Sequence, residues 1–178
     1  MYNFEQFKID LTSLTGESTP LEYQIDDQFF SSLEDSQVQG GSLHVSGSIR
    51  KANGFFELLL HTVGTVSVPC DRCLDMMEQP VEAYQELAVK LGSEGRDVGG
   101  DIIVVDEKSG ILDTSWLIYE SIALAVPIQH VHQPGDCNVS MSEKLQSLSA
   151  ARSSDADTGD SIDPRWQGLL KLRDDADS

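Results

Sequence analysis

The sequence has few cysteines and no long apolar run. Its three cysteines, an odd number among 178 residues, do not form the paired framework of a disulfide-rich secreted domain. It contains no run of about 18 apolar residues, so no hydrophobic membrane-spanning helix is expected. The start, MYNFEQFKIDL, lacks the basic and apolar regions of a secretory signal. We therefore expect a cytoplasmic protein with no membrane contact.

Basic residues are also scarce. Twelve Lys and Arg residues stand against thirty Asp and Glu residues, which gives a formal net charge of −18. The longest basic run is the pair Arg50–Lys51, so the chain shows no basic patch of the kind that binds phosphates directly. An acidic surface of this kind is either a solvated face or a surface that receives a basic protein.

Recognised catalytic motifs are missing as well. The sequence has no P-loop, no glycine-rich dinucleotide loop, no His-Glu-x-x-His motif and no nucleophile elbow. Its four histidines, His44, His61, His130 and His132, have no nucleophile or acidic partner at a recognised catalytic spacing. We therefore predict a protein that is not an enzyme.

Alternating apolar residues are present and predict strands. SLHVSGSIRK and FFELLLHTVGTVSVP flank Asn53–Gly54, a pair that favours a two-residue type I′ hairpin turn. Gly64 within the second run suggests a bulge or a sharp twist. Further strand-like segments cover residues 4–11, 21–26, 81–91 and 102–105.

Helical signals follow these strands. Asp26 can cap a short helix that contains Phe29, and Pro127 ends a longer helix that begins near residue 115. In that longer helix Glu120 shares a stripe with Trp116, so we expect it to be partly buried. We predict an α+β fold: a twisted antiparallel sheet of about five or six strands, open or barrel-like, with helices at 115–126 and 140–149 packed on one side.

Composition divides the chain into three parts. Residues 1–148 are predicted to form one folded domain. Residues 149–163 (SAARSSDADTGDSID) are predicted to form an acidic disordered linker. Residues 164–174 are predicted to form an amphipathic helix, with Asp163 as its N-cap and Pro164 as its first residue. This short helix either docks on the domain or folds onto a partner. Its candidate partner-binding residues are Trp166, Leu169 and Leu170.

The cysteines allow three interpretations. Cys70 and Cys73 form a Cys-x-x-Cys pair, which is the commonest half of a zinc site. Cys137 with His132 would complete a Cys₃His set, and His130 is an alternative fourth ligand. The other two interpretations are reduced thiols without a metal and a redox pair.

The order of several motifs resembles the YceD-type domain family of bacteria, long described as a domain of unknown function. The resemblance rests on VPCDRCLD, PVEAYQELAVKLG, LDTSWLIYESIALAVPIQHVH and GDCN, and covers most of residues 1–146. The final DPRWQGLLKL also resembles the usual end of that family. The family's common form has a second cysteine cluster, which is reduced here to Cys137, so a metal site would need His130 or His132.

This resemblance implies a role in the accumulation of large-subunit (23S) ribosomal RNA and in ribosome assembly. It implies no catalytic residue. Because the chain is so acidic, we expect it to act through a basic ribosomal or ribosome-assembly protein, with indirect contact to rRNA. The alternative is a small zinc-binding interaction module with a partner outside the ribosome.

Overall fold

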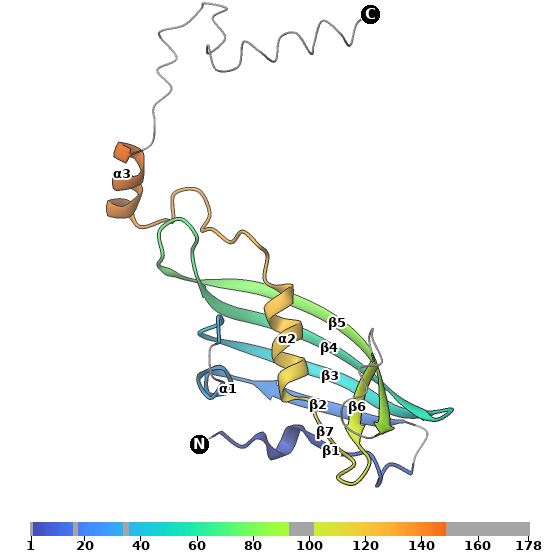
Figure 1. Cartoon of the computed structure of the whole chain (residues 1–178). Helices are drawn as coiled ribbons and strands as arrows, with labels where there is room; N and C mark the ends of the chain where they lie inside the picture. Colours follow the sequence, from blue (N-terminus) through green and yellow to red (C-terminus); the bar gives the residue numbers. More distant parts are fainter. Residues whose placement is uncertain (1, 16–17, 34–35, 93–101, 149–178) are drawn as a thin grey trace, which may run out of the picture. The chain divides into compact units, whose positions relative to one another are not determined.

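The structure, a computed structural model, describes residues 2–15, 18–33, 36–92 and 102–148. Its main element is a five-stranded sheet with the order β2-β3-β4-β5-β6, and α2 lies across one face of it (Figure 1). These strands are β2 (Thr19–Ile25), β3 (Gly40–Ala52), β4 (Phe55–Pro69), β5 (Met76–Gly92) and β6 (Ile102–Asp106). The predicted α+β class is confirmed.

The predicted hairpin joins β3 to β4. Its register runs without interruption from Gly40 opposite Ser67 to Ala52 opposite Phe55, so the bulge suggested at Gly64 is absent. A side chain at Gly64 would stand 2.2 Å from the carbonyl oxygen of Ser42, which explains the glycine by the close approach of β3. In the turn only Gly54 has a positive φ, of 88°, so the predicted type I′ geometry is wrong.

One pairing departs from the antiparallel prediction. β6 runs parallel to β5, with Ala88 opposite Ile102, while the other three pairs in this sheet are antiparallel. The sheet is open in the described residues, with β2 and β6 at its edges. A second, two-stranded sheet joins β1 (Lys8–Asp10) to β7 (Ile111–Asp113), a pairing between distant segments that the sequence pattern does not reveal.

The core lies between the main sheet and the helices. The sheet contributes alternate residues, such as the buried Leu58 and Leu60 of β4. Aromatic rings cover one end: Phe7, from the 3-10 helix η1 (Phe4–Phe7), packs against Phe29 of α1 (Asp27–Ser31), with ring centroids 5.4 Å apart. As predicted, the carboxylate of Asp26 caps α1 by accepting a hydrogen bond from the N–H of Phe29.

Two hydrogen bonds to distant segments hold the N-terminal half of helix α2 (Ser115–Ala125) in place. Before it, Thr114 donates from Oγ1 to the carbonyl of Phe7 at 2.9 Å. Farther along, the hydroxyl of Tyr119 accepts a hydrogen bond from the N–H of Gln37. The buried face consists of Ser115, Ile118, Tyr119, Ser121 and Ile122.

The predicted partial burial of Glu120, on a stripe shared with Trp116, is wrong. Trp116 is 56% exposed and Glu120 is also exposed, because the helix turns Ile118 and Ile122 toward the core instead. The position of Trp116 in the sequence therefore did not predict which side of this helix faces the core.

Helix α3 (Val139–Leu148) has no buried residue. Its first turn is capped by Asn138, whose Oδ1 accepts from the N–H of Met141. The predicted linker at 149–163 and the predicted helix at 164–174, with Trp166, Leu169 and Leu170, lie outside the described residues. Within the described residues, no helix combines the length and the apolar character needed to cross a membrane.

Candidate metal centre

The Cys-x-x-Cys lies in the turn between β4 and β5. These strands are paired up to Pro69 opposite Met76, so residues 70–75 close a tight connection. Leu74 adopts a positive φ of 65°, and its N–H donates to the carbonyl of Cys70 at 2.9 Å. The turn therefore presents Cys70 and Cys73 from a well-defined backbone, as expected for a site at the end of a strand.

The second pair of candidate ligands comes from the loop between α2 and α3. This loop, residues 127–138, is attached to the turn by backbone hydrogen bonds. The N–H of Asp71 donates to the carbonyl of His130 at 3.0 Å, and the N–H of His130 donates to the carboxylate of Asp71 at 2.8 Å. At its other end the amide of Asn138 donates to the carboxylate of Asp75.

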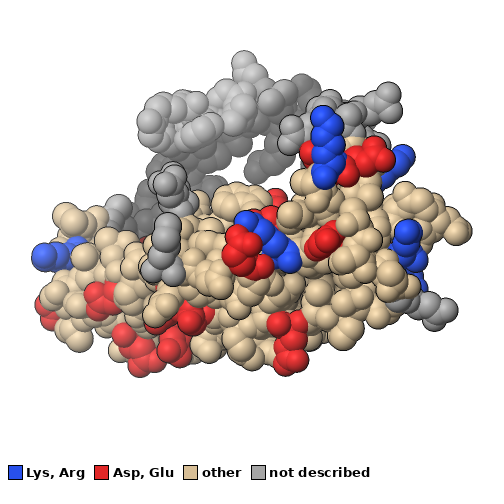
Figure 2. Space-filling model, turned by 90° about the horizontal axis from the view of Figure 1, so that it is seen from below, with Lys and Arg blue, Asp and Glu red and all other residues tan. Residues whose placement is uncertain are grey.

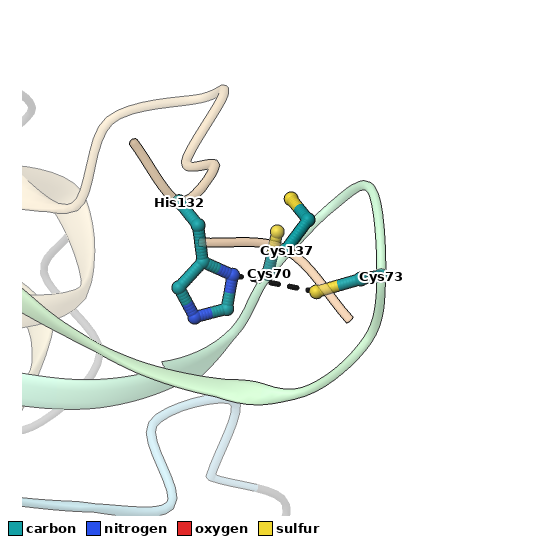
Figure 3. A group of neighbouring side chains, drawn as sticks. All are labelled: Cys70, Cys73, His132 and Cys137. Carbon is teal, nitrogen blue, oxygen red and sulfur yellow. Dashed lines mark hydrogen bonds between the residues drawn. The ribbon is translucent and has the colours of Figure 1, made fainter. Parts of the chain in front are cut away.

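These contacts bring together the four residues named from the sequence. The sulfur atoms of Cys70, Cys73 and Cys137 and a ring nitrogen of His132 lie within 4.8 Å of one another. Figure 3 shows the side chains converging from the turn and the loop, with Nδ1 of His132 at 3.3 Å from Sγ of Cys73. Cys70 and Cys73 are buried, and the other two are partly exposed.

The turn also favours an ionised sulfur. Burial opposes ionisation of Cys70, but hydrogen bonds from the backbone N–H groups of Cys73, His132 and Arg72 outweigh it and lower the pKa of this thiol to about 6. Hydrogen bonding to Cys70 raises the pKa of His132. Burial, with hydrogen bonds to the other two sulfurs, raises the pKa of Cys137. In the absence of a metal, these backbone hydrogen bonds favour the thiolate form of Cys70.

The donor set and its spacing suit zinc. Three thiolates and one imidazole complete a tetrahedral shell and leave no open position, which is the pattern of a structural zinc site. Zn–S bonds of about 2.3 Å place tetrahedral sulfur ligands about 3.8 Å apart. A span of 4.8 Å therefore needs only a small contraction. A metal such as zinc can be held by these four residues.

The alternative ligand, His130, lies outside this cluster. Its Nδ1 is 3.0 Å from the carbonyl of Pro127, and its Nε2 is 3.6 Å from the carboxylate of Asp71. The sequence analysis did not identify Asp71 and Asp75 as residues that attach the loop. The one available signal was their position in CDRCLD, where Asp71 lies inside the cysteine pair and Asp75 lies two residues after it, because a short acidic side chain in a turn often bonds to backbone N–H groups.

The profile of the family described as "Large ribosomal RNA subunit accumulation protein YceD" matches residues 58–173. Neither a curated protein nor a solved structure matched the chain. The match begins within β4, includes all four residues of the cluster and continues to the end of the predicted terminal helix. It spans well over half of the sequence, so the chain belongs to the YceD family.

Proposed function

We propose that this protein is a non-enzymatic accessory factor in the accumulation of large-subunit ribosomal RNA, and that it acts in the cytoplasm by holding a basic ribosomal or assembly protein. Family membership carries the first part of this proposal, because the family is described as an rRNA accumulation protein. That description names no reaction. The family description also favours a ribosomal role over the alternative, a zinc-binding interaction module with a partner outside the ribosome.

The charge of the chain supports the choice of a protein partner. A net charge of −18 repels nucleic acid, whereas unassembled ribosomal proteins are rich in Lys and Arg. On the face shown in Figure 2, the basic side chains stand apart from one another and form no continuous patch. Electrostatic attraction would accelerate the encounter with a basic protein, and salt would weaken it. Contact with rRNA is then indirect.

The metal centre has a structural part in this proposal. Cys70, Cys73, His132 and Cys137 would hold zinc, and the ion would supply a cross-link between the β4–β5 turn and the loop at 127–138. The hydrogen bonds of Asp71 already bring these two segments together. These hydrogen bonds therefore hold the turn and the loop together without the ion. A bound ion would stabilise this arrangement against local unfolding.

The experiment that tests the proposed role is a measurement of rRNA in cells. Deletion of the gene should lower the ratio of large-subunit to small-subunit rRNA, and the wild-type chain should restore it. An unchanged ratio in the deletion strain would remove the basis of the proposal. A chain lacking 149–178 gives a further comparison, because the family match includes most of this region.

A further inference from the structure

The face of the main sheet opposite the core has an unusual set of side chains. The strand register places twelve outward-facing positions in three rows across β2, β3, β4 and β5. From row to row these are Pro20, Ser48, Leu59 and Glu86; then Glu22, Ser46, His61 and Tyr84; then Gln24, His44, Val63 and Glu82. We call these twelve residues the outer patch. It contains three carboxylates and no Lys or Arg.

Two apolar side chains and one aromatic side chain of the outer patch are exposed. Leu59 is 37% exposed, Val63 is 42% exposed and Tyr84 is 75% exposed. A depression of about 560 Å³ is lined by Ser46, Gly47, Ser48, Leu59, Leu60, His61, Tyr84, Gln85 and Glu86. The helices of the core pack on the other face, where Ile118 and Ile122 join the buried residues of the sheet. Within the described residues this face is exposed, and apolar side chains gathered on an exposed sheet face mark an interaction site.

Tyr84 is held in place as an anchor. One face of its ring stacks on His61, with centroids 4.1 Å apart and the planes 8° from parallel. Its hydroxyl donates to Glu82 at 2.7 Å, and the same carboxylate oxygen lies 3.0 Å from Nε2 of His61. An exposed aromatic ring fixed in this way loses little side-chain entropy on binding, as is typical of residues that dominate interface energies.

The charges identify the partner's chemistry. Glu22 lies in the same row as Tyr84, and Glu82 and Glu86 flank it along β5. The nearest cation beyond these rows on β3, Arg50, donates from Nε to Glu57 at 2.6 Å and so is already paired. A ring with the carboxylates of Glu82 and Glu86 on either side of it along β5 attracts an ammonium or guanidinium group by both cation–π and ionic interactions.

We propose that the outer patch is the docking surface for a Lys- or Arg-containing segment of a basic protein. This inference rests on the proposed function and specifies the surface that it uses. A cation of the segment lies over Tyr84 between Glu82 and Glu86, and adjacent apolar side chains fill the depression beside Leu59. RNA is a poorer occupant: its bases could stack on Tyr84, but its phosphates would face carboxylates instead of the cationic groove that single-strand binding requires.

Photo-crosslinking with the full chain tests this surface. The photoreactive residue p-benzoylphenylalanine is placed at Ser46, inside the outer patch, or at Ser31, an exposed position on α1. The probes are the proteins stripped from purified large ribosomal subunits and, in a parallel arm, large-subunit rRNA. We expect crosslinks from Ser46 to a Lys- or Arg-containing protein segment and none from Ser31. Crosslinks from Ser46 to rRNA or to residues 149–178 would overturn the inference.

Substitutions in the patch give the second measurement. Tyr84→Ala and Glu86→Gln should each weaken binding of the crosslinked protein, by about tenfold or more for Tyr84→Ala. Trp116→Ala and Glu107→Gln remove an exposed aromatic ring and an exposed charge elsewhere, and should leave affinity unchanged. Equal loss in all four variants would refute the surface. If a basic protein binds but these patch variants bind it normally, the surface is wrong and the proposed function stands. If no subunit protein binds the wild-type chain, the surface and the proposal of a ribosomal-protein partner both fail.

Discussion

Loss of one candidate metal ligand should have a large effect on stability. In the variant Cys137→Ser, the cluster loses the ligand that lies farthest along the chain from Cys73. A cross-link between these two residues closes a segment of about 60 residues, for which loop entropy gives about 4 kcal/mol. The hydrogen bonds of Asp71 still hold part of the loop in the variant, so this value is an upper limit.

The corresponding change in melting temperature is easily measured. A stability change of 1 kcal/mol shifts the Tm of a domain of this size by about 2–4 °C, so the loss of the ligand should lower Tm by up to about 16 °C. Metal content is measured by mass spectrometry in protein purified without chelator, and Tm by calorimetry with and without EDTA. We expect one zinc per wild-type chain, and a fall in Tm with EDTA that Cys137→Ser does not show.

A matched control lies next to the ligand. Asp136→Asn changes an exposed carboxylate and should retain both zinc and the wild-type Tm. If the wild-type chain contains no zinc and its Tm does not respond to EDTA, the assignment of the cluster as a metal centre is refuted.

Further predictions concern single residues. His132→Ala should abolish zinc binding while His130→Ala keeps it, because only the ring of His132 lies in the cluster; metal analysis of both variants decides this. In the metal-free reduced protein, one thiolate absorbing near 240 nm should appear with a midpoint at about pH 6 and be absent in Cys70→Ser, because a lowered pKa leaves the thiol ionised above that pH. A midpoint above pH 8 would contradict the described turn geometry. Phe29→Ala should lower the free energy of unfolding by about 3–5 kcal/mol in chemical denaturation, because the ring is fully buried; a loss below about 1 kcal/mol would be inconsistent with that burial.

Local signals in the sequence predicted local structure well. Asn53–Gly54 located the hairpin, and Asp26 located the cap of α1. Both features depend on residues close together in the chain, so composition and period suffice to detect them. The turn type was missed because only Gly54 takes a positive φ, and an Asn-Gly pair does not reveal whether one or both of its residues will do so.

Long-range features were predicted less well. Nothing in IIVV indicates that β6 pairs parallel to β5, or that β1 pairs with β7, since pairing depends on how the intervening chain returns to the sheet. The same limit explains Trp116, whose exposure depends on which side of α2 meets the sheet.

The candidate metal centre was predictable for a different reason. The chain has only three cysteines, so the choice of donors was small, and the structure brings all three together with His132. The Asp71 and Asp75 contacts that place the loop beside the turn were not predictable, because aspartates are common in this chain.

Sedimentation of the native protein tests whether it associates with large-subunit precursors through a basic protein. Cells are lysed gently at low salt, and the protein, its associated proteins and rRNA are followed through a gradient, with one portion treated with nuclease first. We expect that the protein sediments with large-subunit precursors, is released by high salt, and keeps a basic protein partner after nuclease treatment. Association through a basic protein would be contradicted if the protein sediments alone at low salt, or if it loses all its associated proteins when RNA is digested.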